Sequence, residues 1–423
     1  MNLIQFIQSF LHRKGAHVLL SFGLSKVVNF VVAVVVIRML TQEEYGFIAY
    51  ALTIISFIMP FMGAGIHQGL LRYGSLGDSQ IGKRDLLHFT LKKGLLYSAL
   101  IAGCVLLLLP FITTNLKGAA LFLGILSFQL IAILFLQFVQ IYCRLLHLNK
   151  LYAKIEISNS LLLLVGNIGM AYFFGGLGYV LSLALVPFIV AVFYMFRLKL
   201  FDTSGSEKFK PVSVRQFVNY GLSVSVAGVL AQLLFAVDIM MIGNVIEGSE
   251  EAVAELVAQY KAASIIPFSF LMIPVAMLST DFVKLSRASK NDKTYLKNYY
   301  LNYLKLFFWI SLSLLAFFYF FGKPVLGLFG KDYQGASELL NIFAIGIVGG
   351  LLFRVPLGNM LSAIGWPKIN ALFSLIVLVI NLIANYYMVK TYGIIGAAIT
   401  TACLMWFSGF LSLGAFVYFL KKG

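Results

Sequence analysis

The chain has 423 residues, of which 61% are hydrophobic and 11% are charged, and its mean hydropathy is +0.93. A soluble domain has about 25% charged residues, so this composition excludes an ordinary water-soluble fold. The formal net charge of +16 would suggest a nucleic-acid partner for a soluble protein. Here the cations fall mainly in alternate connectors between long apolar stretches, and we predict no nucleic-acid partner.

The first segment, residues 1–15, combines an apolar and a polar face. Leu3, Phe6, Ile7 and Phe10 recur at helical spacing, which predicts an amphipathic helix in the membrane interface. The apolar run that follows is too long for the core of a signal peptide, and we expect no cleaved leader.

The rest of the chain alternates between apolar stretches of about 20 residues, the length that crosses a bilayer as a helix, and short polar connectors. We predict twelve spans: 16–37, 47–69, 94–113, 119–142, 158–175, 177–196, 220–245, 262–283, 304–322, 338–361, 371–389 and 394–418.

The distribution of the 32 Lys and Arg residues orients these spans. With the N-terminus inside, most cations lie in cytoplasmic connectors, as the positive-inside rule requires. The cations of the outer connectors are Arg38, Lys117, Lys323, Lys331 and Lys390. Lys26, Lys261 and Arg354 lie within or at the edge of spans. We therefore place both termini in the cytoplasm and the chain in the inner, cytoplasmic membrane.

A hydrophilic connector divides the spans into two groups of six. The expected organisation is an N-lobe over 16–196, a cytoplasmic linker over 197–219 and a C-lobe over 220–423. Short identities support a repeat: Gly23-Leu24-Ser25 matches Gly221-Leu222-Ser223, and Tyr45 matches Tyr260. Lobes with an even number of spans enter the membrane in the same direction, as in transporters built from parallel repeats. We predict an all-α polytopic protein with two pseudo-symmetric six-helix lobes.

Motifs for catalysis or cofactors are missing. The closest approach to a phosphate-binding loop, Gly77 to Arg84, has Arg84 where Ser or Thr must bind magnesium, and no strand precedes it. The histidines and cysteines lack the spacing of metal ligands or of a disulfide framework; they are His12, His17, His67, His88 and His147, and Cys104, Cys143 and Cys403. We predict a protein that is not an enzyme and has no cofactor and no bound metal.

Three charged residues lie at bilayer depth: Lys26, Asp238 and Arg354. Inserting a charge there costs about 2.5–3.5 kcal/mol, so such residues normally face a bundle interior or an aqueous cavity. Two cations and one acid favour a cavity that attracts an anion. The alternative is structural: Asp238 pairs with Lys26 or Arg354 and holds the lobes together.

Amides within the spans are a second set of candidates, either as cavity lining or as hydrogen bonds between helices. Three of them, on the fourth span, lie within about 80° of one another on a helix. The full set is Asn29, Gln129, Gln137, Gln140, Asn381 and Asn385. Arg38, Arg72 and His67 lie near span ends, where we expect side chains to reach toward the interface.

Several runs resemble a known family. VIRMLTQEEYG (Val36 to Gly46), the end of the second span at Gly63-Ala64-Gly65, and Leu71-Arg72-Tyr73 are similar to the amino-terminal signature of Wzx-type polysaccharide biosynthesis flippases. These belong to the multidrug, oligosaccharidyl-lipid and polysaccharide exporter superfamily. Further similarity lies in DIMMIG from Asp238, QYKAA from Gln259, Asn359 to Pro367, the Asn381 helix, and YGIIGAA from Tyr392.

The resemblance implies a flippase that carries an undecaprenyl-diphosphate-linked oligosaccharide across the membrane by alternating access. It implies the bilayer and this lipid as partners, with a polysaccharide polymerase and glycosyltransferases as candidate protein partners. Lys26 and Arg354 would contact the diphosphate, and Arg38 and Arg72 would lie at the cavity mouths. Asp238 would be a countercharge or a site of coupling to a proton or sodium gradient.

Two other functions compete with this interpretation. The first is an ion-coupled multidrug antiporter of the same superfamily, in which Asp238 would titrate and the substrate would be cationic. The second is a membrane glycan polymerase, which would need acid or base residues on its outer face.

Overall fold

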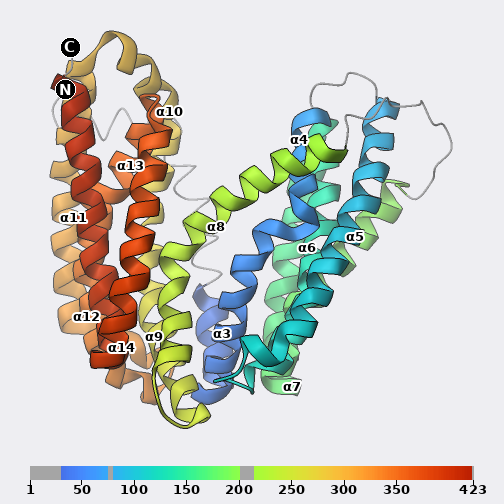
Figure 1. Cartoon of the computed structure of the whole chain (residues 1–423), viewed down its shortest axis with the longest axis horizontal. Coiled ribbons are helices and arrows are strands. Elements are labelled where there is room, and N and C mark those ends of the chain that lie inside the picture. Colours follow the sequence, from blue (N-terminus) through green and yellow to red (C-terminus); the bar gives the residue numbers. More distant parts are fainter. Residues whose placement is uncertain (1–29, 75–79, 201–213, 422–423) are drawn as a thin grey trace. The chain divides into compact units, whose positions relative to one another are not determined.

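The computed structural model describes residues 30–74, 80–200 and 214–421, and all regular structure in these ranges is helical (Figure 1). The predicted interfacial helix at 1–15, Lys26 and Asn29 lie outside the described residues, and so does most of the 197–219 linker. The prediction of an all-α polytopic membrane fold is confirmed.

The first half of the described chain contains the helices that follow. After a short apolar helix at Phe30–Met39 come α3 (Gln42–Ile58), the irregular turn η2 (Met59–Gly65), α4 (Ile66–Gly74), α5 (Gln80–Ile112), α6 (Ala119–Leu145) and α7 (Asn149–Arg197).

The second half of the chain is also helical. It contains α8 (Val214–Val245), α9 (Glu250–Ser269), α10 (Met272–Asn291), α11 (Lys293–Gly327), the 3₁₀ turn η3 (Lys331–Ala336), α12 (Ser337–Gly349), the π-helical turn η4 (Gly350–Arg354), α13 (Val355–Ala363) and α14 (Pro367–Lys421).

Eight helical stretches of the described chain are long and apolar enough to cross a membrane. Two of them, α7 and α14, reverse direction at a glycine and supply two spans each. The short helix at Phe30–Met39 is the described part of the predicted first span, and α8 coincides with the predicted seventh span. Described helices therefore lie in each of the twelve predicted spans.

The reversals in α7 and α14 share one backbone geometry. Gly175 has φ 59° and ψ −142°, and Gly393 has φ 58° and ψ −140°. Only glycine adopts this region without strain. Three residues later, a Cβ on Gly178 would lie 1.9 Å from the Met170 carbonyl oxygen, and a Cβ on Gly396 would lie 2.0 Å from the equivalent carbonyl. The same Gly-x-x-G hairpin thus occurs in both halves of the chain.

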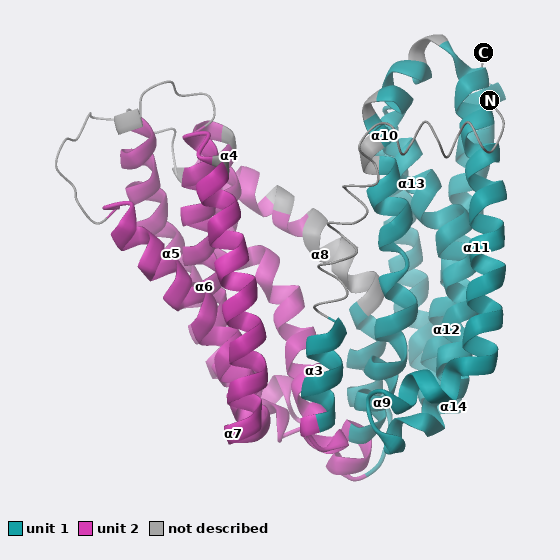
Figure 2. Ribbon diagram, turned by 180° about the vertical axis from the view of Figure 1, so that it is seen from behind, with its two compact units in different colours: residues 1–38, 234–248, 255–423 teal, residues 39–233, 249–254 magenta. Residues whose placement is uncertain are grey.

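Contacts divide the chain into two compact units that do not follow chain order (Figure 2). Unit 1 comprises residues 1–38, 234–248 and 255–423, and unit 2 comprises residues 39–233 and 249–254. In unit 2, α6 packs against α3, α5 and α7 around one apolar core. In unit 1, α10 to α14 enclose a second core.

The outer helices carry large apolar side chains on their free faces. Leu107 and Phe111 on α5, and Tyr319 and Phe320 on α11, are all highly exposed. An apolar surface of this kind suits a lipid environment, in which the backbone polar groups are satisfied within each helix.

Candidate functional site

The second predicted span of the chain, which lies in unit 2, is interrupted. Between α3 and α4, Met62 has an extended ψ of 132°, and Gly63, Ala64 and Gly65 have φ values of 59°, 51° and 70°. The Gly63 N–H donates to Ser98 Oγ at 2.8 Å. Non-helical backbone at membrane depth is tolerated where it is buried in protein or lines a cavity.

A pocket of about 350 Å³ lies beside this interruption, within unit 2. We call it the α6 pocket; its polar lining residues are Ser56, His67, Gln68, Gln129, Gln137 and Ser225. Leu52, Ile55, Met59, Pro60 and Met62 supply an apolar wall.

The three predicted amides of α6 have different environments. Gln129 and Gln137 both line the α6 pocket. Gln140 does not; its Nε2 donates to Glu156 Oε2 on α7 at 2.6 Å. The helical spacing predicted that the three side chains lie on one side of α6, but only two of them line the pocket, and the third pairs with Glu156 of α7.

Gln129 is 7% exposed, and of the two polar atoms of its amide one is hydrogen-bonded to a described residue. Its Nε2 donates to the Leu183 carbonyl at 3.2 Å. Its Oε1 has no hydrogen-bond partner among the residues that the structure describes. The pocket therefore offers a buried acceptor to a bound group.

His67 is buried in this pocket, where Gln68 Nε2 donates to its Nε2 at 3.0 Å. The expectation that His67 reaches toward the interface is therefore wrong. The interruption of the second span places α4 so that this side chain points into unit 2.

In unit 1, Asp238 on α8 lies at the centre of a buried polar cluster. Its carboxylate, 1% exposed, accepts hydrogen bonds from Tyr260 Oη at 2.5 Å, Thr401 Oγ1 at 2.6 Å and Asn385 Nδ2 at 2.7 Å. An ionised carboxylate only accepts hydrogen bonds, and three donors satisfy it. All three donors are neutral.

The predicted amides Asn381 and Asn385 belong to this cluster. Asn385 Nδ2 also donates to Asn381 Oδ1, whereas Asn385 Oδ1 has no partner within the described part of the chain. Oxygens of Asp238, Asn381, Asn385 and Thr401 are thus gathered at one place. Such a set suits a small hard cation or a proton.

Arg354 lies in η4, the π-helical turn that interrupts the tenth span. Its Nη1 donates to Asn370 Oδ1 at 3.1 Å and its Nη2 to Ser374 Oγ at 2.9 Å. Both partners are neutral, and no ion pair joins Arg354 to Asp238, although both are described. The structure therefore does not show the ion pair between Asp238 and Arg354 that the structural alternative proposed.

Two tyrosines of α11 hold the π-helical turn in place. Tyr303 Oη donates to the Leu351 carbonyl at 2.7 Å, and Tyr300 Oη donates to the Leu352 carbonyl at 3.1 Å. Carbonyls displaced from α-helical geometry need such partners when buried. Turns of this kind are frequent at functional sites.

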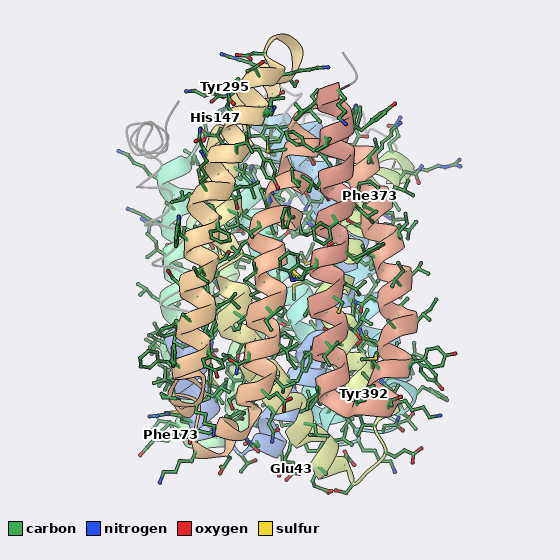
Figure 3. The ribbon with its side chains drawn as sticks, turned by 90° about the vertical axis from the view of Figure 1, so that its left-hand side faces the viewer. Glu43, His147, Phe173, Tyr295, Phe373 and Tyr392 are labelled. Atoms are coloured by element: carbon green, nitrogen blue, oxygen red, sulfur yellow. The ribbon has the colours of Figure 1, made fainter. Side chains whose placement is uncertain are left out.

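One face of α14 connects the two clusters of unit 1. Asn370, Ser374, Asn381 and Asn385 lie within about 60° of one another at 100° per residue. Ser374 and Asn385 are eleven positions apart, or about 17 Å along the axis. Figure 3 shows Phe373 in the part of α14 away from its hairpin and Tyr392 at the hairpin. Asn370 and Ser374 were not among the sequence candidates, although they continue the Asn381 and Asn385 spacing.

The remaining predicted cations lie elsewhere. Arg38 is exposed and donates through Nε to the Leu328 carbonyl at 2.6 Å and through Nη2 to the Gly327 carbonyl at 3.2 Å. It thus caps the C-terminus of α11, where a cation is favoured, and its place at a cavity mouth stays a prediction. Arg72 lies in α4, and its side chain is outside the described residues.

A second buried carboxylate was missed by the sequence interpretation. Asp281 on α10 is 2% exposed and accepts from Tyr299 Oη at 2.9 Å. The sequence interpretation, which set the cations Lys26 and Arg354 against Asp238 as the one acid, therefore left out a buried acid.

Comparison with known families gives a clear assignment. The model described as polysaccharide biosynthesis protein matches residues 11–278, more than half of the chain. The chain belongs to the polysaccharide biosynthesis protein family. A second model, MatE, matches residues 224–387. The predicted resemblance is confirmed.

Named relatives of this polysaccharide biosynthesis protein match over part of their length. A Shigella flexneri protein named as a candidate O-antigen transporter is 29% identical over 183 residues, 43% of this chain and 42% of that protein. A Haloferax volcanii protein named as a candidate low-salt glycan biosynthesis flippase is 25% identical over 195 residues, 45% of this chain and 39% of that protein. The matches thus span about two fifths of these relatives. As both are named for transport, they agree with the prediction that the chain is not an enzyme.

The fold has solved counterparts. The lipid II flippase MurJ in an inward closed conformation superposes with a TM-score of 0.73 at 15% identity, over 95% of this chain and 87% of that one. At this identity the similarity shows the fold alone. Together with the eight apolar stretches, it makes this polysaccharide biosynthesis protein a multi-pass protein of the cell membrane.

Proposed function

We propose that the protein flips an undecaprenyl-diphosphate-linked oligosaccharide across the cytoplasmic membrane by alternating access. The observation that carries the proposal is Arg354, a partly buried cation at membrane depth whose described partners, Asn370 and Ser374, are neutral. A buried charge is costly without a counterion. The diphosphate of the substrate would be that counterion.

Guanidinium chemistry suits this role. Arginine has five N–H donors, and the bonds to Asn370 and Ser374 use one on each Nη atom. The planar fork binds phosphate oxygens in pairs, and such charged hydrogen bonds are about twice as strong as neutral ones. We propose Lys26 as a second diphosphate contact, by virtue of its predicted depth in the first span.

For Asp238 we propose a role in coupling. Its three donors are neutral, and the open oxygen of Asn385 adds an acceptor beside it. A proton or a sodium ion bound here would supply the missing positive charge. Since Asp238 and Arg354 lie in one unit and both contact α14, ion binding and substrate binding can act on the same helix.

The experiment is leaflet assignment of the lipid-linked oligosaccharide in cells that lack the protein and have no other flippase for this lipid. Expression of the wild type should restore the outer-leaflet pool, whereas Arg354→Gln and Lys26→Ala should leave the lipid in the inner leaflet. Arg144→Gln is the matched control, because Arg144 is an exposed cation at the end of α6. Normal export in cells without the protein would overturn the proposal.

One observation favours a second candidate, an ion-coupled exporter of cationic drugs. The MatE model matches residues 224–387, which include Asp238. That function predicts cationic dye efflux that Asp238→Asn abolishes and Arg354→Gln leaves intact. The flippase predicts the opposite dependence on Arg354.

A further inference from the structure

We propose that the α6 pocket binds one uncharged sugar ring of the lipid-linked glycan; the assignment rests on the proposed flippase function. Arg354 in unit 1 would recognise the diphosphate common to all such lipids. The α6 pocket in unit 2 would recognise the glycan, and it is the source of substrate selectivity.

The charge of the pocket excludes a diphosphate as its ligand. Among the described residues that line it there is no Lys, Arg, Asp or Glu. Phosphate groups are bound by arginine, lysine or helix N-termini. A neutral lining suits a neutral ligand.

The polar groups match hydroxyl chemistry. Gln129 Oε1 is a buried acceptor with no partner in the described part of the chain, and a sugar hydroxyl would satisfy it by donating. The Ser56 and Ser225 hydroxyls already donate to the carbonyls of Thr53 and Pro60, which leaves their oxygens as further acceptors. A hydroxyl both donates and accepts, so one ring can use several of these groups at once.

Gln137 supplies a complementary donor. It lines the pocket eight residues after Gln129 on the same helix, and its amide makes no hydrogen bond to the described residues. An amide offers two N–H donors and one acceptor. Acceptors and donors therefore both face the pocket.

The size and apolar wall fit a single ring. Ligand pockets span about 300–1,000 Å³, and this one, at about 350 Å³, is near the lower end. Leu52, Met59 and Met62 would pack against the C–H face of the ring. A whole oligosaccharide or a lipid chain is too large for this space.

The wall formed by the interrupted helix has a precedent in transporter architecture. Met59, Pro60 and Met62 come from η2, where the backbone is not α-helical. Substrate sites of secondary transporters are typically built from such discontinuous helices. The Gly63 N–H donates to Ser98 Oγ, and Ser225 Oγ donates to the Pro60 carbonyl, so the shape of the wall is determined by the fold.

The test compares two probes on purified protein: undecaprenyl diphosphate alone, and the undecaprenyl-diphosphate-linked oligosaccharide extracted from cells that lack the protein. The wild type should bind the glycosylated lipid more tightly than the bare one. Gln137→Met and Gln129→Met should weaken binding of the glycosylated lipid about tenfold and leave binding of the bare lipid unchanged. Gln137→Met disturbs no hydrogen bond to the residues that the structure describes, so it keeps the test valid if Gln129→Met does not fold.

Gln140→Met is the matched control, since this neighbouring amide pairs with Glu156 outside the pocket; it should bind both lipids like the wild type. Arg354→Gln should weaken binding of both probes equally. Variants of Gln129 and Gln137 that keep the wild-type preference would overturn the sugar assignment, and so would a wild type without any preference. A wild type that binds neither lipid would overturn the flippase function itself.

Discussion

At the scale of single residues, Asp238 shows what the sequence can predict about a buried charged group and what it cannot. A carboxylate in a membrane span was recognisable from the sequence, because such residues are costly and rarely accidental. Its partners were not: Thr401 and Asn385 lie 163 and 147 positions away in the chain. Only packing of α8 against both arms of α14 brings them together.

Removal of one donor should have a measurable cost. Thr401→Val deletes the hydroxyl that donates to Asp238 and should lower the free energy of unfolding by about 1.5–3 kcal/mol, since the bond involves a charged acceptor. The measurement is unfolding of purified protein in detergent, followed by tyrosine and tryptophan fluorescence.

The adjacent Thr400 provides the control. It is equally buried, but its hydroxyl donates to the Gly396 carbonyl within its own helix, and Thr400→Val should cost less than about 1 kcal/mol. Equal losses for the two variants would contradict an important role for the Asp238 cluster in stability.

Arg354 and the α6 amides show how much of the site helical spacing can predict. The periodicity predicted that Gln129, Gln137 and Gln140 share one side of α6, and the pocket contains the first two. It did not predict that Glu156 takes the third. Nor did it show the π-helical turn at Arg354, because that turn depends on the hydroxyls of Tyr300 and Tyr303 from α11.

At the level of elements, the spans were predictable because hydropathy is a local property of about 20 residues. The interruption at η2 was not predicted, although Pro60, Gly63 and Gly65 stand in the sequence. A proline alone is tolerated in a membrane helix. The bend at this place also requires Gly65 to meet Gly221, where a Cβ would lie 2.4 Å from a backbone atom.

The requirement for glycine at the α7 and α14 hairpins can be tested by substitution. Gly393 has φ 58° with no atom within 4 Å of an added Cβ, so Gly393→Ala tests backbone strain alone. We expect a loss of about 1–3 kcal/mol in the free energy of unfolding.

Gly414 on the same helix α14 is also in open space but has no positive φ. Gly414→Ala should be neutral or stabilise by up to about 1 kcal/mol, as alanine is the better helix former. Both variants are compared by thermal unfolding, and a Gly393→Ala variant as stable as the wild type would contradict the hairpin geometry.

For the whole molecule, the composition was the most informative feature: a chain with 11% charged residues and long apolar stretches has few alternatives to a helical bundle in a bilayer. Each unit has its own buried core. The division of tasks that we propose assigns charge recognition to unit 1 and sugar recognition to unit 2.

Flipping itself can be measured with the purified protein in vesicles that contain the undecaprenyl-diphosphate-linked oligosaccharide in both leaflets. A membrane-impermeant periodate reagent added outside oxidises only the glycans that it can reach. With the wild type, oxidation should proceed from the outer-leaflet half to nearly all of the lipid. With Arg354→Gln it should stop near half, as in vesicles without protein. Wild-type vesicles that also stop near half, with the protein folded and inserted, would contradict the proposed function.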